Sequence, residues 1–385
     1  MENMKIKNIL IISLSFLLIS FSSYAQDKRT TETKVADLLA RLPANDLQFN
    51  NKLMGDMLLL GETGIKQICD QIVAPGTGND TSPRFAIESL SRFLSQSGKE
   101  TERAMWEKIC ISYAIEKKDN NVKDFFMKQL QLIGGDKSAE AVKIYLGNKE
   151  LCEPALAVIK AVGGKNSETI IAEALKNKDL PCAAAAMNAL SLINSQVAVN
   201  EYIAWTSNSN PDIKASAYNA LAQSASPAAY PVLSKAAMDA SYKWERTGAT
   251  AALLNYARNI GKNGDVKTAD KICKLVISKC DEDLTIQNKT DALDIYTSLH
   301  GVKAMPELIK AASHPNKKYR NAAMRMSLAL QGTEVTNKWV AAFKKAIPEA
   351  KPEIISMLGI RGDVTAIPLV TASLSDTDVA TRAEA

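Results

Sequence analysis

Side chains suited to acid–base or metal chemistry are scarce in this chain of 385 residues. Its two histidines, His300 and His314, occur in neither a His-Glu-x-x-His nor a His-x-His pattern, the spacings that favour zinc binding. His300 precedes Gly301 at a predicted helix end, where a cation interacts favourably with the helix dipole. His314 precedes Pro315 and predicts a turn between two helices. Both histidines are therefore interpreted as structural.

Patterns for nucleophilic or carboxylate chemistry are missing as well. The sequence contains no Gly-x-Ser-x-Gly elbow, and no cysteine has a histidine partner in its sequence context. Asp281-Glu282-Asp283 lacks the spaced oxygens and central glycine of a calcium loop, so we expect a solvated turn there. The glycines of residues 74–80 lack the Gly-Lys-Ser/Thr that a phosphate-binding loop needs. We predict no catalytic, metal or cofactor-binding residue, and no enzymatic activity for this region.

A basic segment is the main charge feature of the chain. Between Lys303 and Lys351 there are ten basic residues and three acidic ones, a local balance of +7. If several of them share a concave face, they would attract an acidic polymer or a negatively charged partner; the alternative is scattered, solvent-facing charge. Nucleic acid is not expected, because interleaved aromatic residues are missing. The candidate patch for an anionic partner comprises Lys303, Lys310, Lys317, Lys318, Arg320, Arg325, Lys338, Lys344 and Lys345.

Four tryptophans raise the question of carbohydrate binding, because an indole face suits a sugar ring. They are Trp106, Trp205, Trp244 and Trp339. Their irregular spacing in separate helical segments favours packing positions. Carbohydrate contact would need at least two of them exposed on one surface.

Helices must position all of these side chains. Hydrophobic residues make up 46% of the chain and aromatic residues 6%, which suits closely packed, alanine-rich helices better than a β-sandwich. Val158-Ile159, Ala189-Leu190 and Ala220-Leu221 recur at intervals of 31 residues, each in an alanine-rich stretch. Such a period predicts a stack of helix pairs, so the expected fold is all-α, an α-solenoid.

The repeat is explicit from Ile133 onward and predicts an array over residues 133–385. Its helix pairs are expected at residues 133–162, 163–193, 195–223, 226–260, 264–300, 303–330, 333–360 and 363–385. The second helix of the fourth pair is expected from about Tyr242 to Ile260, ended by Gly261. Because Ala385 falls within a second helix without a closing glycine, the array is expected to be incomplete at its C-terminus. Residues 26–132 are expected to form a less regular N-terminal cap region, with helices over 31–41, 46–60, 62–73, 82–96, 100–117 and 119–133.

The six cysteines pose a question of oxidation state. Cys273 and Cys280 are seven residues apart on one predicted helix, roughly 10 Å along its axis and too far to bridge. Cys152 and Cys182 begin the second helices of neighbouring pairs, about a helix diameter apart, which is also longer than a disulfide tolerates. We therefore favour buried thiols, with one or more disulfides as the open alternative. The full set is Cys69, Cys110, Cys152, Cys182, Cys273 and Cys280.

The last predicted pair has the most specific motif. Its first helix follows Gly362-Asp363 and contains Ala366-Ile367-Pro368-Leu369, and its second follows Asp376-Thr377-Asp378 and contains Arg382. This pattern resembles the HEAT-like repeat of the phycobilin-lyase type. About 250 residues resemble this family, which implies the fold and lends no catalytic residue. As a whole, the chain is similar to the N-terminal solenoid of exported bacterial proteins that carry a 3-keto-disaccharide hydrolase domain.

Residues 1–25 differ from the rest of the chain. Lys5 and Lys7 precede an apolar run over residues 9–19, and small residues precede a cut after Ala25, as in a secretory signal peptide. The run is short for a membrane span. We expect an exported protein, periplasmic or extracellular after cleavage near Ala25.

These observations together predict an exported, non-enzymatic interaction scaffold. A solenoid face would bind a protein partner or a further C-terminal domain. The alternative, implied by the resemblance, is an accessory region of a glycan-processing hydrolase whose catalytic domain lies beyond Ala385. Carbohydrate and acidic polymers remain candidate partners, whereas nucleic acid and a membrane span are not expected.

Overall fold

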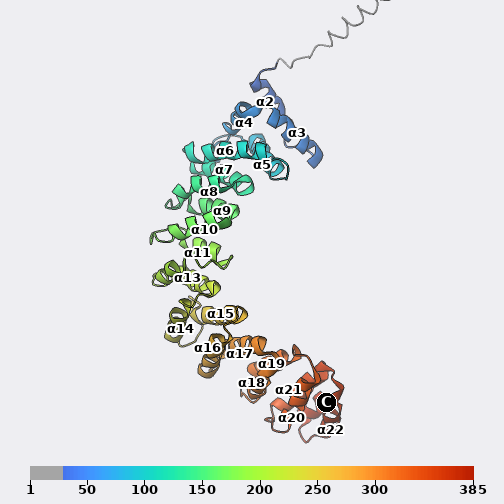
Figure 1. Cartoon of the computed structure of the whole chain (residues 1–385). Helices are drawn as coiled ribbons and strands as arrows, with labels where there is room; N and C mark the ends of the chain where they lie inside the picture. The colour runs from blue at the N-terminus through green and yellow to red at the C-terminus, as the bar shows by residue number, and fades with distance from the viewer. Residues whose placement is uncertain (1–28) are drawn as a thin grey trace, which may run out of the picture. The chain divides into compact units, whose positions relative to one another are not determined.

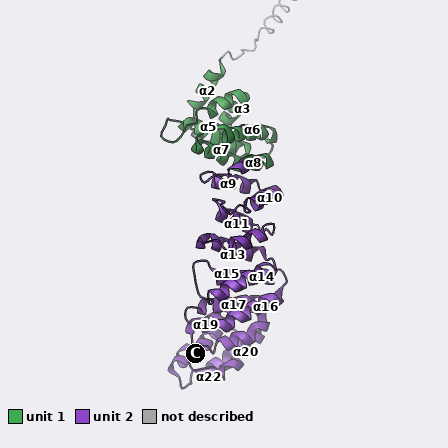
Figure 2. Ribbon diagram, turned by 90° about the vertical axis from the view of Figure 1, so that its left-hand side faces the viewer, with its two compact units in different colours: residues 1–141 green, residues 142–385 purple. Residues whose placement is uncertain are grey.

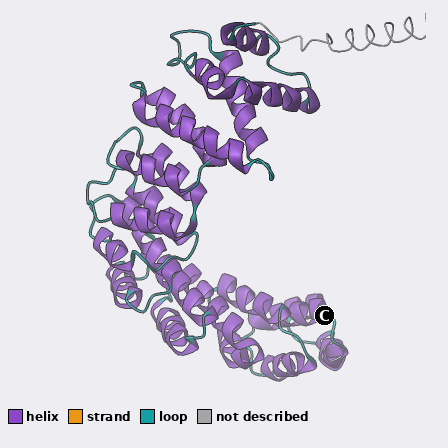
Figure 3. Ribbon diagram, turned by 45° about the horizontal axis from the view of Figure 1, so that its top comes forward, coloured by secondary structure: helices purple, strands orange, loops and turns teal. Residues whose placement is uncertain are grey.

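The computed structural model of the protein describes residues 29–385, so the predicted signal peptide over residues 1–25 lies outside the described residues. From Arg29 to Ala385 the chain consists of helices and loops without a strand (Figure 3). None of the helices in this part is long and apolar enough to cross a membrane. The all-α fold expected from composition and periodicity is therefore confirmed.

The described chain forms two compact units that divide between Ala141 and Val142 (Figure 2). In unit 1, α6 packs along α7, and both pack on α5. The Trp106 indole is fully buried and donates a hydrogen bond to the Ser91 hydroxyl of α5, with an Nε1–Oγ distance of 2.9 Å. The helices are α2 (Thr31–Leu39), α3 (Leu47–Leu59), α4 (Gly61–Cys69), α5 (Thr81–Leu94), α6 (Glu100–Glu116), α7 (Asn120–Ile133) and α8 (Asp136–Val142), the last of which ends at the division.

Unit 2 is a stack of helix pairs. The first helices are α10 (Gly164–Ala174), α12 (Val199–Trp205), α14 (Ala229–Asp239), α16 (Val266–Lys279), α18 (Met305–Ala311), α20 (Thr333–Phe343) and α22 (Ile367–Ser373), with short 3-10 turns η1 (Lys143–Tyr145), η2 (Gly301–Ala304) and η3 (Val364–Ala366). The second helices are α9 (Cys152–Val162), α11 (Ala183–Ser191), α13 (Pro211–Ser224), α15 (Ala249–Lys262), α17 (Ile286–His300), α19 (Lys317–Leu328), α21 (Ala350–Arg361) and α23 (Val379–Glu384).

The two rows of helices in unit 2 pack differently. Each second helix packs directly on the next second helix from α9 to α23, whereas contacts between successive first helices are sparser. The second-helix row is thus the tighter, inner side of unit 2 (Figure 1). Between the rows lies the apolar core, in which Trp339 and Met305 are fully buried.

Local sequence signals set the helix ends. Pro211 occupies the first turn of α13, where it costs no hydrogen bond, and the Asn210 side chain accepts from the Asp212 amide at 2.9 Å. Gly362 ends α21 with a φ of +69°, a conformation that glycine adopts without steric cost. Asp378 caps α23 by accepting from the Thr381 amide at 2.7 Å.

The fourth helix pair departs from the expected boundaries. A helix was expected from about residue 242 to 260, but Ser241 and Tyr242 have positive φ angles, and α15 begins only at Ala249. Gly261, expected to end the helix, lies inside α15 and is buried. A Cβ atom at Gly261 would lie 2.8 Å from the methyl groups of Leu299 on α17. This glycine therefore permits a close helix approach and does not end the helix.

The expectation that Cys152 and Cys182 are too far apart to bridge is wrong. The structure joins them in a disulfide with a Cα–Cα distance of 5.8 Å. Helix axes about 8–10 Å apart bring facing Cα atoms far closer, because each Cα lies about 2.3 Å from its own axis. The other cysteines, Cys69, Cys110, Cys273 and Cys280, are buried free thiols, as expected.

Candidate binding groove

Four second helices line a groove of about 1210 Å³ in unit 2. It extends over α17, α19, α21 and α23, with α21 packing on α19 and on α23. The apolar lining side chains Ile286, Ala322, Met324 and Met357 are buried. Ile360 also lines the groove and is 72% exposed. The groove therefore has an apolar base that is partly open to solvent.

The exposed charges around this base differ between its two sides. On α19 they are Lys317, Lys318 and Arg325, and on the α21 and α23 side they are Glu349, Asp378 and Glu384. Both sets are solvent-exposed, and they balance in number. The groove thus has a basic wall and an acidic wall, and no net charge from its exposed rim.

A buried ion pair crosses the base of the groove. Arg320 on α19 binds both carboxylate oxygens of Glu353 on α21, with Nε–Oε2 and Nη2–Oε1 distances of 2.8 Å. The two side chains are only 5% and 12% exposed. Arg320 Nη1 also donates to the carbonyl oxygens of His314 and Pro315, at 2.9 and 2.8 Å. Arg320 therefore joins two repeats and is not free to bind a partner.

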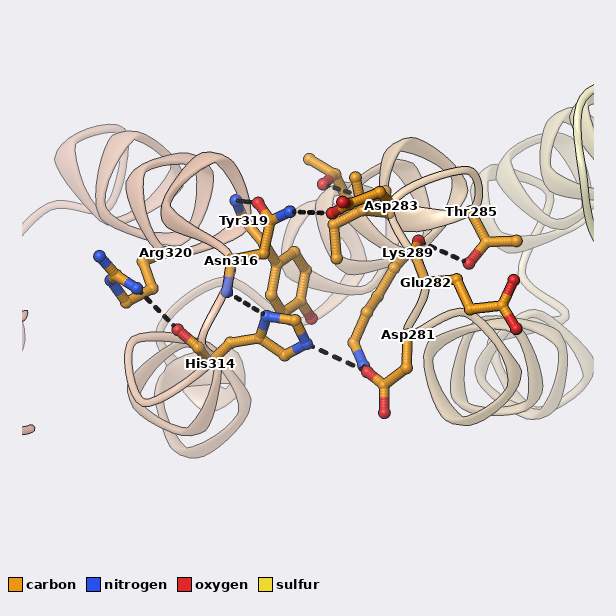
Figure 4. Close-up of polar contacts among 11 residues, drawn as sticks. Asp281, Glu282, Asp283, Thr285, Lys289, His314, Asn316, Tyr319 and Arg320 are labelled. Carbon is orange, nitrogen blue, oxygen red and sulfur yellow. Dashed lines mark hydrogen bonds and ion pairs between the residues drawn. The ribbon is translucent and has the colours of Figure 1, made fainter.

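A polar cluster lies in the turns that precede α17 and α19 (Figure 4). The Lys289 ammonium contacts the Asp281 carboxylate, which also lies 3.0 Å from His314 Nε2. The backbone N–H of Asn316 donates to His314 Nδ1 at 3.0 Å. Because Nδ1 accepts this bond, Nε2 carries the ring proton and donates to Asp281. Asn316 Nδ2 donates to Asp283 Oδ1 at 2.9 Å. The hydrogen bonds that Asp281 accepts lower the pKa of its carboxyl group; the bond from Lys289 has the largest effect, and the bond from His314 has the next largest.

The comparisons with known proteins identify the repeat. A family model described as HEAT repeats matches residues 167–254. Residues 167–254 are therefore similar to HEAT repeats. No curated protein matches it.

Solved structures that are similar to this chain cover most of it at low identity. One is an engineered protein, with 14% identity, a TM-score of 0.36, and coverage of 91% of this chain and 97% of that chain. Another comes from a structure describing Kap95p binding to RanGDP, with 11% identity, a TM-score of 0.38, and coverage of 97% and 53%. A third comes from a structure describing tubulin recruitment by microtubule polymerases with TOG-domain arrays, with 9% identity, a TM-score of 0.24, and coverage of 93% and 91%.

The motif that resembled this repeat type has the expected local roles. Asp363 precedes η3 and α22, the first helix of the last pair, and its carboxylate accepts from the Thr365 backbone amide at 3.0 Å. Arg382 Nη1 donates to the carbonyl oxygens of Asp376 and Thr377 at 2.7 and 3.0 Å. Arg320 makes the same bonds to its own inter-helix turn. Arg320 and Arg382 therefore each stabilise the turn from the first to the second helix of their own pair.

The structure separates the nine basic residues of the candidate patch. Lys317, Lys318, Arg320 and Arg325 line the groove, whereas Lys310 lines a second cavity of about 560 Å³ beside the His314 cluster. On α20, Lys338 pairs with Glu334 at 3.0 Å. The remaining three are exposed outside both cavities: Lys303, Lys344 and Lys345. The basic segment alternates between first and second helices, so the HEAT-like repeats do not gather it on one face.

Tryptophans and metal ligands add no further site. Trp106, Trp205 and Trp339 are buried, and Trp244 is 84% exposed, so no two indoles share an open surface. Within residues 29–385, no group of histidine, cysteine, aspartate or glutamate side chains is arranged to hold a metal ion.

Proposed function

We propose that this protein is an exported, non-enzymatic scaffold that binds a protein partner through the groove over α17–α23. The groove supports this proposal, because an apolar base framed by exposed charges is the arrangement that excludes water while fixing the register of a partner. Stacked helix pairs offer such extended surfaces without catalytic groups.

Export is supported by two separate features. Residues 1–25 have the pattern of a secretory signal peptide, and the Cys152–Cys182 disulfide suits an oxidising compartment. If the full chain is exported, denatured protein from the producing cell contains four reactive thiols before reduction and six after it. A variant lacking residues 2–25 stays in the cytoplasm and contains six in both cases. Equal thiol counts for the two forms would contradict the proposal of export.

The groove is tested by capturing partners with residues 26–385 from a periplasmic extract. The groove variant K317E/K318E/R325E reverses three exposed charges that line the cavity. The matched control K303E/K344E/K345E makes the same charge change at exposed lysines outside both cavities. We expect the groove variant to lose a partner that the wild type and the control retain. Equal recovery by both variants overturns the proposal, provided that their circular dichroism matches the wild type.

Carbohydrate is the weaker candidate partner. Among the four tryptophans, only Trp244 is open to stacking on a sugar ring. We expect residues 26–385 neither to bind nor to cleave oligosaccharides. Saturable oligosaccharide binding would favour the alternative proposal, in which the repeats accompany a glycan-processing hydrolase domain, and turnover would refute a non-enzymatic role.

A further inference from the structure

We infer that the partner presents an amphipathic helix with one acidic edge and one basic edge. The acidic edge lies along α19, and the basic edge lies along the α21 and α23 side of the groove. This inference rests on the proposed function and names the chemistry of the partner.

The width of the groove fits one helix. Both α19 and α23 pack on α21, and packed helices lie about 8–10 Å apart. The axes of α19 and α23, on either side of α21, are therefore about two such spacings apart, which accommodates a helix of about 10–12 Å diameter laid over α21. An amphipathic helix laid in a groove would cover Ile360 and the buried apolar lining beneath it.

The charges on the walls determine which edges the helix needs. Lys317, Lys318 and Arg325 face the groove from α19 without an opposite charge on the same wall. Glu349 and Glu384 face it from the other side, together with Asp378. The Arg320–Glu353 pair satisfies its own charges at the base. A partner with segregated edge charges therefore meets opposite charge on both sides.

A uniformly acidic partner fits less well. It would gain contacts with the α19 wall, but it would bring like charges against Glu349, Asp378 and Glu384. The expectation of an anionic partner rests on the charges of residues 303–351, and Glu353, Asp378 and Glu384 lie after this segment. The groove therefore selects for separation of charges and not for net negative charge.

The test uses three labelled helical peptides that share one leucine stripe. The first has glutamates along one edge and lysines along the other, and the second has the same composition with both types mixed on each edge. The third has glutamates on both edges. We expect residues 26–385 to bind the segregated peptide about tenfold more tightly than either of the others at low salt, as measured by fluorescence anisotropy.

A charge-reversal variant gives a positive readout that a misfolded protein could not. In K317E/K318E/R325E both walls are acidic, so the preference should move to a fourth peptide with lysines on both edges. The matched control K303E/K344E/K345E should keep the preference of the wild type. Equal affinity for the segregated and mixed peptides, or tighter binding of the all-glutamate peptide, overturns the inference.

Failure of this inference is distinguishable from failure of the proposed function. If the groove variant still loses its partner in the capture experiment while the peptides show no charge preference, the scaffold role stands and the helix chemistry is wrong. If capture is unaffected by the groove variant, the proposed function itself fails.

Discussion

Two stretches of unit 2 join consecutive repeats in different ways. Between α9 and α13 the helices are rich in alanine, and the Cys152–Cys182 disulfide links two neighbouring pairs. Two hydrogen bonds to the preceding repeat add to it: the Trp205 indole donates to the Leu175 carbonyl at 2.8 Å, and the Ser195 hydroxyl donates to the Glu168 carboxylate at 2.8 Å. Between α16 and α23 the links are mostly polar side chains that lie about one repeat apart. They are Asp281–His314, Asp283–Asn316, Arg320–Glu353 and Thr336–Asp363.

This difference shows that the helix-pair period does not dictate how repeats are held together. Close approach of small side chains permits a covalent link in the first stretch, whereas larger side chains in the second leave polar groups that need partners. Reductant should lower the stability of the first stretch, and loss of charge should lower the stability of the second. Variants that alter one kind of link therefore test the comparison directly.

The largest expected effect is the loss of Arg320. The variant Arg320→Ala leaves Glu353 nearly buried without its partner, and removing one member of a buried pair costs about 3–5 kcal/mol. Urea unfolding followed by the fluorescence of Trp339, which is buried in the same stretch, measures the loss. The double variant Arg320→Met/Glu353→Leu should recover most of the stability. A single-variant loss below about 1 kcal/mol would contradict a structural role for the pair.

Removing the disulfide should have the next largest effect. The variant Cys152→Ala/Cys182→Ala releases a loop closed over a separation of 30 residues. Closure of such a loop stabilises the folded state by about 3–4 kcal/mol in the chain-entropy treatment. Hydrogen exchange should show the loss of protection in α9 and α11 and little change in α19 and α21. Reductant should destabilise the wild type and leave the variant unaffected; an equal response of both would refute the link.

Much of this fold could be predicted from local signals. Alanine-rich stretches that recur at intervals of 31 residues predicted the helix pairs. The helix ends depend on signals that act within a few residues, such as Pro211 at the start of α13 and Gly362 at the end of α21. The boundary near Tyr242 was missed, since its left-handed backbone depends on packing between repeats and not on local propensity.

The groove and its polar links could not be predicted in the same way, because they join residues one repeat apart. A search for opposite charges about 33 residues apart would have found Arg320–Glu353, and it would have placed His314 with Asp281. The spacing of helix axes does not predict the disulfide, because facing Cα atoms lie much closer together than the axes do. Which exposed charges share a wall depends on helix rotation, which the period does not specify.

Acid should weaken the polar stretch, with a smaller effect than either variant above. Hydrogen bonds from Lys289 and from Thr336 lower the pKa values of Asp281 and Asp363, respectively, in the folded state. Their contribution to stability is present above the unfolded aspartate pKa of about 3.9 and is lost as the pH falls through the lower folded values. Hydrogen-exchange protection, corrected for intrinsic rates, should therefore fall in α17–α21 between pH 5 and acidic values below about pH 3.

The matched control for this pH prediction is Asp281→Asn, which retains the shape of the side chain and removes its titration. The variant should be less stable at pH 7 and less sensitive to acid. The disulfide of the α9–α13 stretch does not titrate, so reductant rather than acid should lower protection there. Equal acid sensitivity of the two stretches would remove the distinction between them.

The smallest expected effect concerns exposed ion pairs, which both stretches contain. Lys338 pairs with Glu334 at 3.0 Å on α20, with side chains 39% and 67% exposed. Lys176 pairs with Glu173 at the C-terminal end of α10, with side chains 58% and 69% exposed. Solvent screens both pairs, so Lys338→Ala should cost no more than about 0.5 kcal/mol in urea unfolding, and Lys176→Ala should leave the unfolding midpoint unchanged. A loss above about 1 kcal/mol for Lys338→Ala alone would mean that surface charge, and not the buried Arg320–Glu353 pair, stabilises the polar stretch.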